Sequence, residues 1–341
     1  MALVYNRNLT KNELLQLTGD ISQIARVKPH TLRDGPESGV YALDVTNGSG
    51  LEFSIIADRG LDISSARYNG MSLAWRSACM DRNPAFFESD GFGWLQTFAG
   101  GLVTTCGLTW NGAPCEDEGK ALGLHGRYSH LPATNVSYNG EWRGDDYFLE
   151  VSGIVRETSV FGDKLQLTRK ITVKLGEKVI RIHDTVENIG SMISPHMILY
   201  HINFGFPIVD ADTRLVAKGK STPRDADAEI DAEHYNLMHS PVQGYREKCY
   251  FIDLEEDESH HATASLINPK LGDGAGVFVR IDKRELPWFT EWKMLGYGEY
   301  VVGLEPGNCL VLGRKREREA GRLQHLKPGE IREYHLEIGV L

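Results

Sequence analysis

Apolar and polar positions alternate in several separated stretches of the chain, which predicts β-strands. Around residues 147–152, 165–170, 180–187 and 332–340, apolar side chains occupy most alternate positions, with charged or hydroxyl side chains between them. A period of two places alternate side chains on opposite faces of a sheet, and one polar face is typical of antiparallel sheets. The pairs Asn139-Gly140, Gly162-Asp163 and Gly176-Glu177 are typical of hairpin turns. The patterns therefore predict a mainly β, antiparallel protein.

One stretch, residues 10–25, has a helical pattern instead. Thr10 followed by Glu13 is a capping-box signature, and apolar residues follow at roughly helical spacing, although Gly19 weakens the pattern. The apolar residues of this expected helical face are Leu14, Leu15, Leu17, Ile21 and Ile24. We therefore expect residues 1–341 to form a single domain, with residues 1–38 as an N-terminal helical extension. Residues 220–236 are acidic and lack alternation, which predicts a long surface loop.

Composition and charge narrow the function classes. The chain has 341 residues, with 37 Lys and Arg against 47 Asp and Glu, so its formal net charge is −10. This balance disfavours nucleic acid as a partner, because binding to it relies on Lys and Arg. No signal peptide and no apolar run of about 18 residues is present, so we expect no membrane partner. Five cysteines without a CxxC pair indicate reduced thiols in a cytoplasmic protein. The sequence leaves open whether the chain forms a homodimer.

Several polar residues stand in apolar, Gly-containing contexts, where the chemistry is expected. His125 lies in LHGRYSH, His201 in LYHINFGFP, Glu305 in VVGLEPGN and Arg59 in ADRGLD. A buried carboxylate is costly unless it is paired. Each of these residues also has a structural interpretation: a hydrogen-bonded core histidine, a buried structural glutamate, or a salt bridge between Asp58 and Arg59. Motifs for nucleotide binding, the GxSxG elbow and HExxH are absent, so no cofactor is expected.

Together these motifs resemble the aldose 1-epimerases, or galactose mutarotase-like proteins, including a bacterial branch of deoxyribose mutarotase-like proteins. The resemblance extends from Gly39 to Leu341 and rests on ADRGLDI, GGLVTTCG, LHGRYSHLPA, LYHINFGFP and PWFTEWKMLGYGEYVVGLEPGN. It implies an antiparallel β-supersandwich with a sugar site on its concave face. It also implies an isomerase that needs neither a cofactor nor a metal.

The resemblance also implies roles for individual residues. His201 matches the family's general acid, Glu305 its general base, and His125 the histidine that helps to hold the sugar. Either Arg59 or Arg127 is expected at the pocket. The other residues expected to bind the sugar are Asn203 beside His201, the aromatic Trp292, and Glu247, which is the weakest match.

The chemistry of mutarotation fits these residue types independently of the resemblance. One group removes the proton of the anomeric hydroxyl while another protonates the ring oxygen, so a carboxylate and an imidazolium suffice. Three alternatives stay open: a glycosidase, which needs a second carboxylate; a metal-dependent sugar isomerase with His125, His201 and Glu305 as ligands; and a sugar-binding protein without catalysis. The expected partner is a small free aldose whose identity the sequence does not show.

Overall fold

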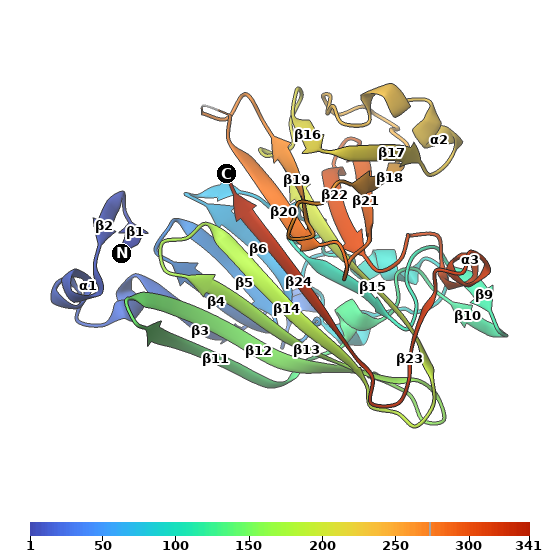
Figure 1. The fold of residues 1–341 in the computed structure, drawn as a ribbon, viewed down its shortest axis with the longest axis horizontal. Helices are drawn as coiled ribbons and strands as arrows, with labels where there is room; N and C mark the ends of the chain where they lie inside the picture. The colour runs from blue at the N-terminus through green and yellow to red at the C-terminus, as the bar shows by residue number, and fades with distance from the viewer. Residues whose placement is uncertain (273) are drawn as a thin grey trace.

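A computed structural model describes residues 1–272 and 274–341 and shows a mainly β protein whose strands form antiparallel sheets (Figure 1). The sheet with the most strands contains the four stretches that alternate most clearly in the sequence. Its strands, in spatial order, are β11 (Thr134–Arg143), β12 (Asp146–Thr158), β13 (Lys164–Lys174), β14 (Val179–Asn188), β24 (Ile331–Val340), β20 (Gly276–Asp282), β19 (His261–Ile267) and β16 (Arg214–Ala217). The predicted antiparallel fold is therefore confirmed.

A second sheet is built around the long strand β15, which pairs with β22 and β8 along its length. Its strands, in spatial order, are β17 (Gly219–Pro223), β18 (Lys248–Leu254), β21 (Trp288–Leu295), β22 (Tyr300–Gly307), β15 (Ser194–Gly205) and β23 (Gln324–Leu326), with β8 (Thr104–Leu108) also on β15. The five-stranded sheet consists of β3 (Ala25–Thr31), β4 (Tyr41–Asn47), β5 (Leu51–Ile56), β6 (Asp62–Tyr68) and β7 (Met71–Ser72). Two small hairpins complete the strands: β1 (Ala2–Val4) with β2 (Arg7–Leu9), and β9 (Cys115–Asp117) with β10 (Lys120–Leu122).

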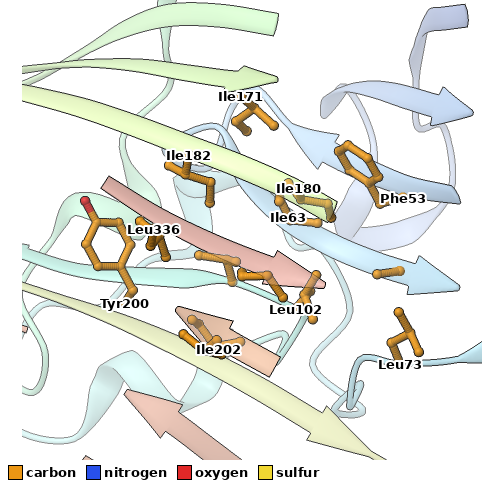
Figure 2. Packing of buried hydrophobic residues seen from close by; sticks show 14 of the residues in the cluster. Phe53, Ile63, Leu73, Leu102, Ile171, Ile180, Ile182, Tyr200, Ile202 and Leu336 are labelled. Atoms are coloured by element: carbon orange, nitrogen blue, oxygen red, sulfur yellow. The ribbon is translucent and has the colours of Figure 1, made fainter. Parts of the chain in front are cut away.

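All three large sheets contribute to one hydrophobic core. Figure 2 shows Ile182 and Leu336 of the first sheet close to Tyr200 of β15, while Phe53 and Ile63 come from the five-stranded sheet. A buried arginine links the sheets across this core. Arg169 of β13 donates hydrogen bonds to Asp184 of β14 and to Asp62 of β6, and its side chain is fully buried.

The N-terminal segment differs from the expected helix over residues 10–25. The capping box at Thr10 is present, but helix α1 (Lys11–Leu17) ends at Leu17, and only a short 3₁₀ turn follows at Ile21–Gln23. Thr18 is extended and Asp20 caps the second turn, so the two pieces are separate; within α1 only Leu14 is buried. The segment before residue 38 also contains β1, β2 and β3, so it is not simply a helical extension.

Two further expectations about local structure were wrong. Asn139-Gly140 lies inside β11 instead of at a turn, and the chain reverses between Arg143 and Asp146. Residues 220–236, expected to be a loop, include most of β17 and the short helix α2 (Ala226–Glu229). Helix α3 (Arg314–Glu319) was not predicted either, because its wholly charged sequence has no apolar period. The turns at Gly162-Asp163 and Gly176-Glu177 do connect successive strands, as predicted.

Candidate active site

Strand register brings His201 and Glu305 together, although about a hundred residues separate them in the chain. In the antiparallel pair β15–β22, Leu199 lies opposite Gly307 and Ile202 opposite Leu304, so the same register places His201 opposite Glu305. Directly opposed side chains point to the same face of a sheet. His201 Nε2 lies 3.2 Å from Glu305 Oε1, and both side chains are buried, with exposed fractions of 6% and 2%.

A glycine makes room for the carboxylate. Gly303 lies two residues before Glu305 on the same face of β22, and a Cβ at this position would lie 2.5 Å from Glu305 Oε1. The same Cβ would lie 3.1 Å from Cβ of Trp292, on the neighbouring strand β21. Any larger residue at position 303 would therefore displace the carboxylate or the indole.

His125 approaches the pair from a turn. Its backbone has φ of 56°, the left-handed region, and Gly126 follows with φ of 80°, so the turn requires unusual backbone conformations at both positions. The His125 ring lies 5.7 Å from that of His201, centroid to centroid, and its Nδ1 lies 3.1 Å from Oδ1 of Asn111. The structure thus brings His125, His201 and Glu305 together, as the sequence predicts, while their roles stay predictions.

Aromatic side chains surround the histidines. Phe98 lies 5.3 Å and Trp292 5.1 Å from the His201 ring, and Trp94 lies 4.8 Å from the His125 ring. Trp94 and Phe98 stack on each other, while Trp75 contacts both Phe98 and Trp292. Flat apolar faces of this kind suit the C–H face of a sugar, while the histidines and Glu305 supply polar contacts.

Burial dominates the ionisation of the three polar residues. It lowers the pKa of His201 to about 4. Burial also lowers the pKa of His125 to about 3, and the nearby charges of His201 and Arg224 act in the same direction. Burial raises the pKa of Glu305 well above its usual range, and Glu247 adds to the rise while Arg224 opposes it. The direction is the same for all three groups: the uncharged form is favoured.

Several buried polar atoms at this site lack a hydrogen-bond partner within the described part of the chain. They are Nδ1 of His201, Oε1 of Glu305 and Oγ1 of Thr290, which lies opposite Glu305 on β21. Native proteins leave few buried polar atoms unpaired, and each needs an explanation. Their position next to the aromatic side chains indicates a site where the hydroxyl groups of a ligand would complete the hydrogen bonding.

The two arginines proposed for the pocket lie elsewhere. The Arg59 guanidinium is buried and donates to the carbonyl oxygens of Arg82 and Thr97, with His130 Nε2 at 3.1 Å. Arg59 therefore holds the segment that carries Trp94 and Phe98. Arg127 lines two neighbouring cavities of about 370 and 200 Å³, and neither includes His201 or Glu305 among its lining residues.

Asn203 is close to His201 in β15 but fully buried. Its side-chain nitrogen donates to the carbonyl oxygens of Gly101 and His201, so it ties backbone segments together. Other aromatic residues near the sequence motifs also lie apart from His201 and Glu305. Phe204 points into the main core, and Tyr297 is exposed in the turn that follows β21.

Glu247 and Trp292 do meet at the rim of the site. Glu247 Oε2 accepts a hydrogen bond of 2.8 Å from the Trp292 indole nitrogen, and Oε1 accepts one of 3.0 Å from Arg224. Arg224 follows β17 directly and also donates to Asp225 and to Sγ of Cys249. Arg224 was not predicted from the sequence, because it lies in a polar stretch without a motif that was expected to be a loop.

Across residues 1–272 and 274–341, no group of three His, Cys, Asp or Glu side chains is placed to hold a metal ion. None of the helices in the same ranges is long and apolar enough to cross a lipid bilayer.

Comparisons with known proteins show the family to which the chain belongs. The chain belongs to the family described as domain of unknown function DUF4432, whose model matches residues 37–340. A comparison with curated proteins finds no match. Among solved structures, a candidate aldose 1-epimerase from Klebsiella pneumoniae subsp. pneumoniae is 26% identical, with a TM-score of 0.89, and the match covers 98% of this chain and 86% of that one.

More distant structures share the fold. A galactose mutarotase-like protein from Clostridium acetobutylicum is 13% identical, with a TM-score of 0.67 over 94% of this chain and 99% of that one. Galactose 1-epimerase from Lactobacillus acidophilus is 10% identical, with a TM-score of 0.60 over 93% and 99%. The fold is therefore that of the galactose mutarotase-like proteins, and the resemblance noted in the sequence is confirmed.

Proposed function

We propose that this protein is an aldose 1-epimerase that interconverts the anomers of a small free aldose. The observation that carries the proposal is the buried His201–Glu305 pair, which lies beside aromatic side chains with several polar atoms unpaired. An acid and a base 3.2 Å apart can act on the ring oxygen and the anomeric hydroxyl of one sugar, because these two oxygens are bonded to the same carbon. His125, Trp292 and Glu247 would hold the sugar.

In the proposed reaction, Glu305 removes the proton of the anomeric hydroxyl while His201 protonates the ring oxygen. The bond between the anomeric carbon and the ring oxygen breaks, and the anomeric C–O bond becomes a carbonyl. Rotation about the bond to the next carbon exposes the other face of the aldehyde. As the ring closes, His201 takes its proton back from the attacking hydroxyl group and Glu305 returns its proton to the carbonyl oxygen, so atoms and charges balance. Each positioned acid or base contributes about 10²–10⁴-fold.

For this reaction, His201 and Glu305 must hold one proton between them. Burial keeps that proton on Glu305 in the free protein and leaves His201 neutral. His201 Nε2 and Glu305 Oε1 lie 3.2 Å apart without a hydrogen bond between them, so sugar binding would have to align the two side chains for this proton to pass. The transfer then produces the carboxylate base and the imidazolium acid without any exchange with solvent. Both arrangements contain one proton, so their interconversion does not depend on pH.

The pH dependence of exchange follows from this proton count. Below pH about 4 His201 binds a second proton, and no base is left on the pair, so we expect kcat/KM, which reports the ionisation of the free protein, to fall as the pH drops through this value. At high pH kcat/KM falls again, as Glu305 loses the shared proton at its raised pKa. Between these two limits kcat/KM should be flat. The measurement is the pH profile of kcat/KM for anomer exchange, and a rise between pH 6 and 7, about the usual pKa of histidine, would contradict the proton count.

A further prediction concerns Gly303→Ala. The added methyl group would displace the Glu305 carboxylate, and an error of about 1 Å in a catalytic group costs about 10²-fold in rate. We therefore expect a loss of this size in kcat for anomer exchange, with the fold retained by circular dichroism. Gly19→Ala is the matched control, because its methyl group would meet nothing within 4 Å. An unchanged rate in Gly303→Ala would show that the carboxylate position is not critical.

The direct test is saturation-transfer NMR of the anomeric protons over a panel of free aldoses. The method reports exchange between the anomers without a coupled enzyme. Exchange that persists after chelation and dialysis supports acid–base catalysis, whereas loss that is restored by added metal supports a metal-dependent isomerase. Sugar binding without faster exchange of any aldose would support the non-catalytic alternative instead.

A further inference from the structure

The rim of the site contains a charged group that the proposed reaction does not use. Arg224 is three strands away from Glu305, because β17, β18, β21 and β22 are successive neighbours. At about 4.8 Å per strand this separation is roughly 14 Å. Arg224 lies near the site because its side chain extends over Cys249 to Glu247, the carboxylate that also binds the Trp292 indole.

Three of the five N–H groups of Arg224 are already used. Nε donates to Asp225, Nη1 to Sγ of Cys249 and Nη2 to Glu247, which fixes the plane of the guanidinium group. One N–H remains on each terminal nitrogen. Arg224 is only partly exposed, and its partner Glu247 also binds the indole of Trp292, whose ring lies 5.1 Å from that of His201, so Arg224 lies close to the site.

The charges at this rim do not favour an anion. Arg224 contributes one positive charge, and its partners Asp225 and Glu247 contribute two negative charges. The other arginine nearby, Arg246, is neutralised by Asp227 at 2.7 Å and is largely exposed. A sugar phosphate or a uronic acid would therefore meet a net negative rim, whereas a neutral hydroxyl group could accept from Arg224 and donate to Glu247.

We infer that Arg224, together with Glu247 beside Trp292, forms a distal subsite that binds the hydroxyl groups of a neutral aldose on the side of the ring away from the anomeric carbon. Arg224 is the specificity-determining residue of this subsite, and Glu247 disfavours anionic sugars. The inference rests on the proposed function for the orientation of the sugar, because the anomeric carbon is placed at His201 and Glu305.

The test uses D-glucose, 4-deoxy-D-glucose and D-glucuronate, which share the anomeric end and differ at the distal end. Both kcat/KM for anomer exchange and binding by saturation-transfer difference NMR are measured. A hydrogen bond to a charged group corresponds to roughly 10- to 100-fold. We expect the wild-type protein to prefer glucose to the 4-deoxy sugar by such a factor. Arg224→Met should remove this preference, and Arg224→Lys, which keeps the charge without the planar fork, should retain only part of it.

A second variant tests the charge argument. Glu247→Gln keeps an acceptor for Trp292 and removes one negative charge, so the use of glucuronate relative to glucose should rise about fivefold. The matched control is Arg246→Met, which loses the same charge as Arg224→Met from an exposed neighbour and should leave all preferences unchanged.

The outcomes separate this inference from the proposed function. If the wild-type protein exchanges the anomers but Arg224→Met keeps the full preference, the distal subsite is wrong and the proposed function stands. Equal use of glucuronate and glucose by the wild-type protein would also overturn the subsite. If exchange is absent but binding still shows a preference for glucose that Arg224→Met removes, the subsite is supported and the epimerase function is wrong.

Discussion

Replacing Glu305 by Gln should lower kcat for anomer exchange by about 10²–10⁴-fold, the usual contribution of a general base. Gln keeps the shape of the side chain but cannot accept the proton of the anomeric hydroxyl. His201→Asn should have an effect of similar size, because it removes the acid that protonates the ring oxygen. Since both changes act on the chemical step, kcat should fall much more than KM changes. The measurement is saturation-transfer NMR on the best aldose of the panel, with both rate and saturation recorded.

The control for this prediction is a residue of the same site with a different role. His125 lies 5.7 Å from His201 and is assigned to holding the sugar, so His125→Asn should also weaken sugar binding. Folding of each variant is verified by near-ultraviolet circular dichroism. If Glu305→Gln or His201→Asn keeps nearly wild-type exchange while folded, that residue is not the catalyst, and the sugar-binding alternative is favoured.

The strands that the sequence predicts well are those with one buried face. β12, β13, β14 and β24 alternate because each packs one side on the shared core, and all four are neighbours in the same sheet. β3 and β17 were missed for the opposite reason. Both are edge strands rich in polar residues, and they contain Pro29 and Pro223, which an edge strand tolerates. The alternation of apolar and polar residues therefore does not predict strands in which neither face is well buried.

The wrong turn assignment has a tertiary cause. Asn139-Gly140 has the composition of a hairpin turn, but a Cβ on Gly140 would lie 2.2 Å from the Tyr147 hydroxyl oxygen, so this glycine makes room for an aromatic side chain of the next strand. The length of the N-terminal helix was overestimated because the apolar spacing continues beyond Leu17, while most of these apolar residues are not buried. In both cases packing, which a single sequence does not show, decided the local structure.

At the candidate site, the sequence identifies residues that have a local motif. His125, His201 and Glu305 each stand in an apolar, glycine-containing segment, and strand register and a tight turn bring them together. Arg59 also stands in a clear motif. However, its guanidinium group points to the segment around Thr97 and donates to backbone carbonyl oxygens there. Arg224 has no motif, and it approaches the site only through the pairing of β17 with β18. Residues that reach the site only through long-range packing therefore cannot be predicted from the sequence.

The largest expected effect on stability belongs to Arg169, which lies behind the candidate site. Its guanidinium binds Asp184 and Asp62, and Asp184 also accepts a hydrogen bond from Tyr200, the neighbour of His201 in β15. Removing one partner of a buried charge cluster leaves the others uncompensated, which typically costs about 3–5 kcal/mol. We therefore expect Arg169→Met to lower the free energy of unfolding by about this amount at pH 7, measured by urea denaturation.

The matched control is Arg181→Met on the neighbouring strand β14. Arg181 also pairs with two carboxylates, Glu177 and Glu337, but its side chain is 40% exposed. Exposed ion pairs contribute about 0–1 kcal/mol, so the same chemical change should have little effect there. If Arg169→Met does not fold, Asp62→Asn tests the same cluster from its more exposed edge, with a smaller expected loss, because Asp184 still balances the arginine. A loss below about 1 kcal/mol in Arg169→Met would contradict this prediction, because it would mean that the buried carboxylates of Asp62 and Asp184 do not depend on the arginine for their stability.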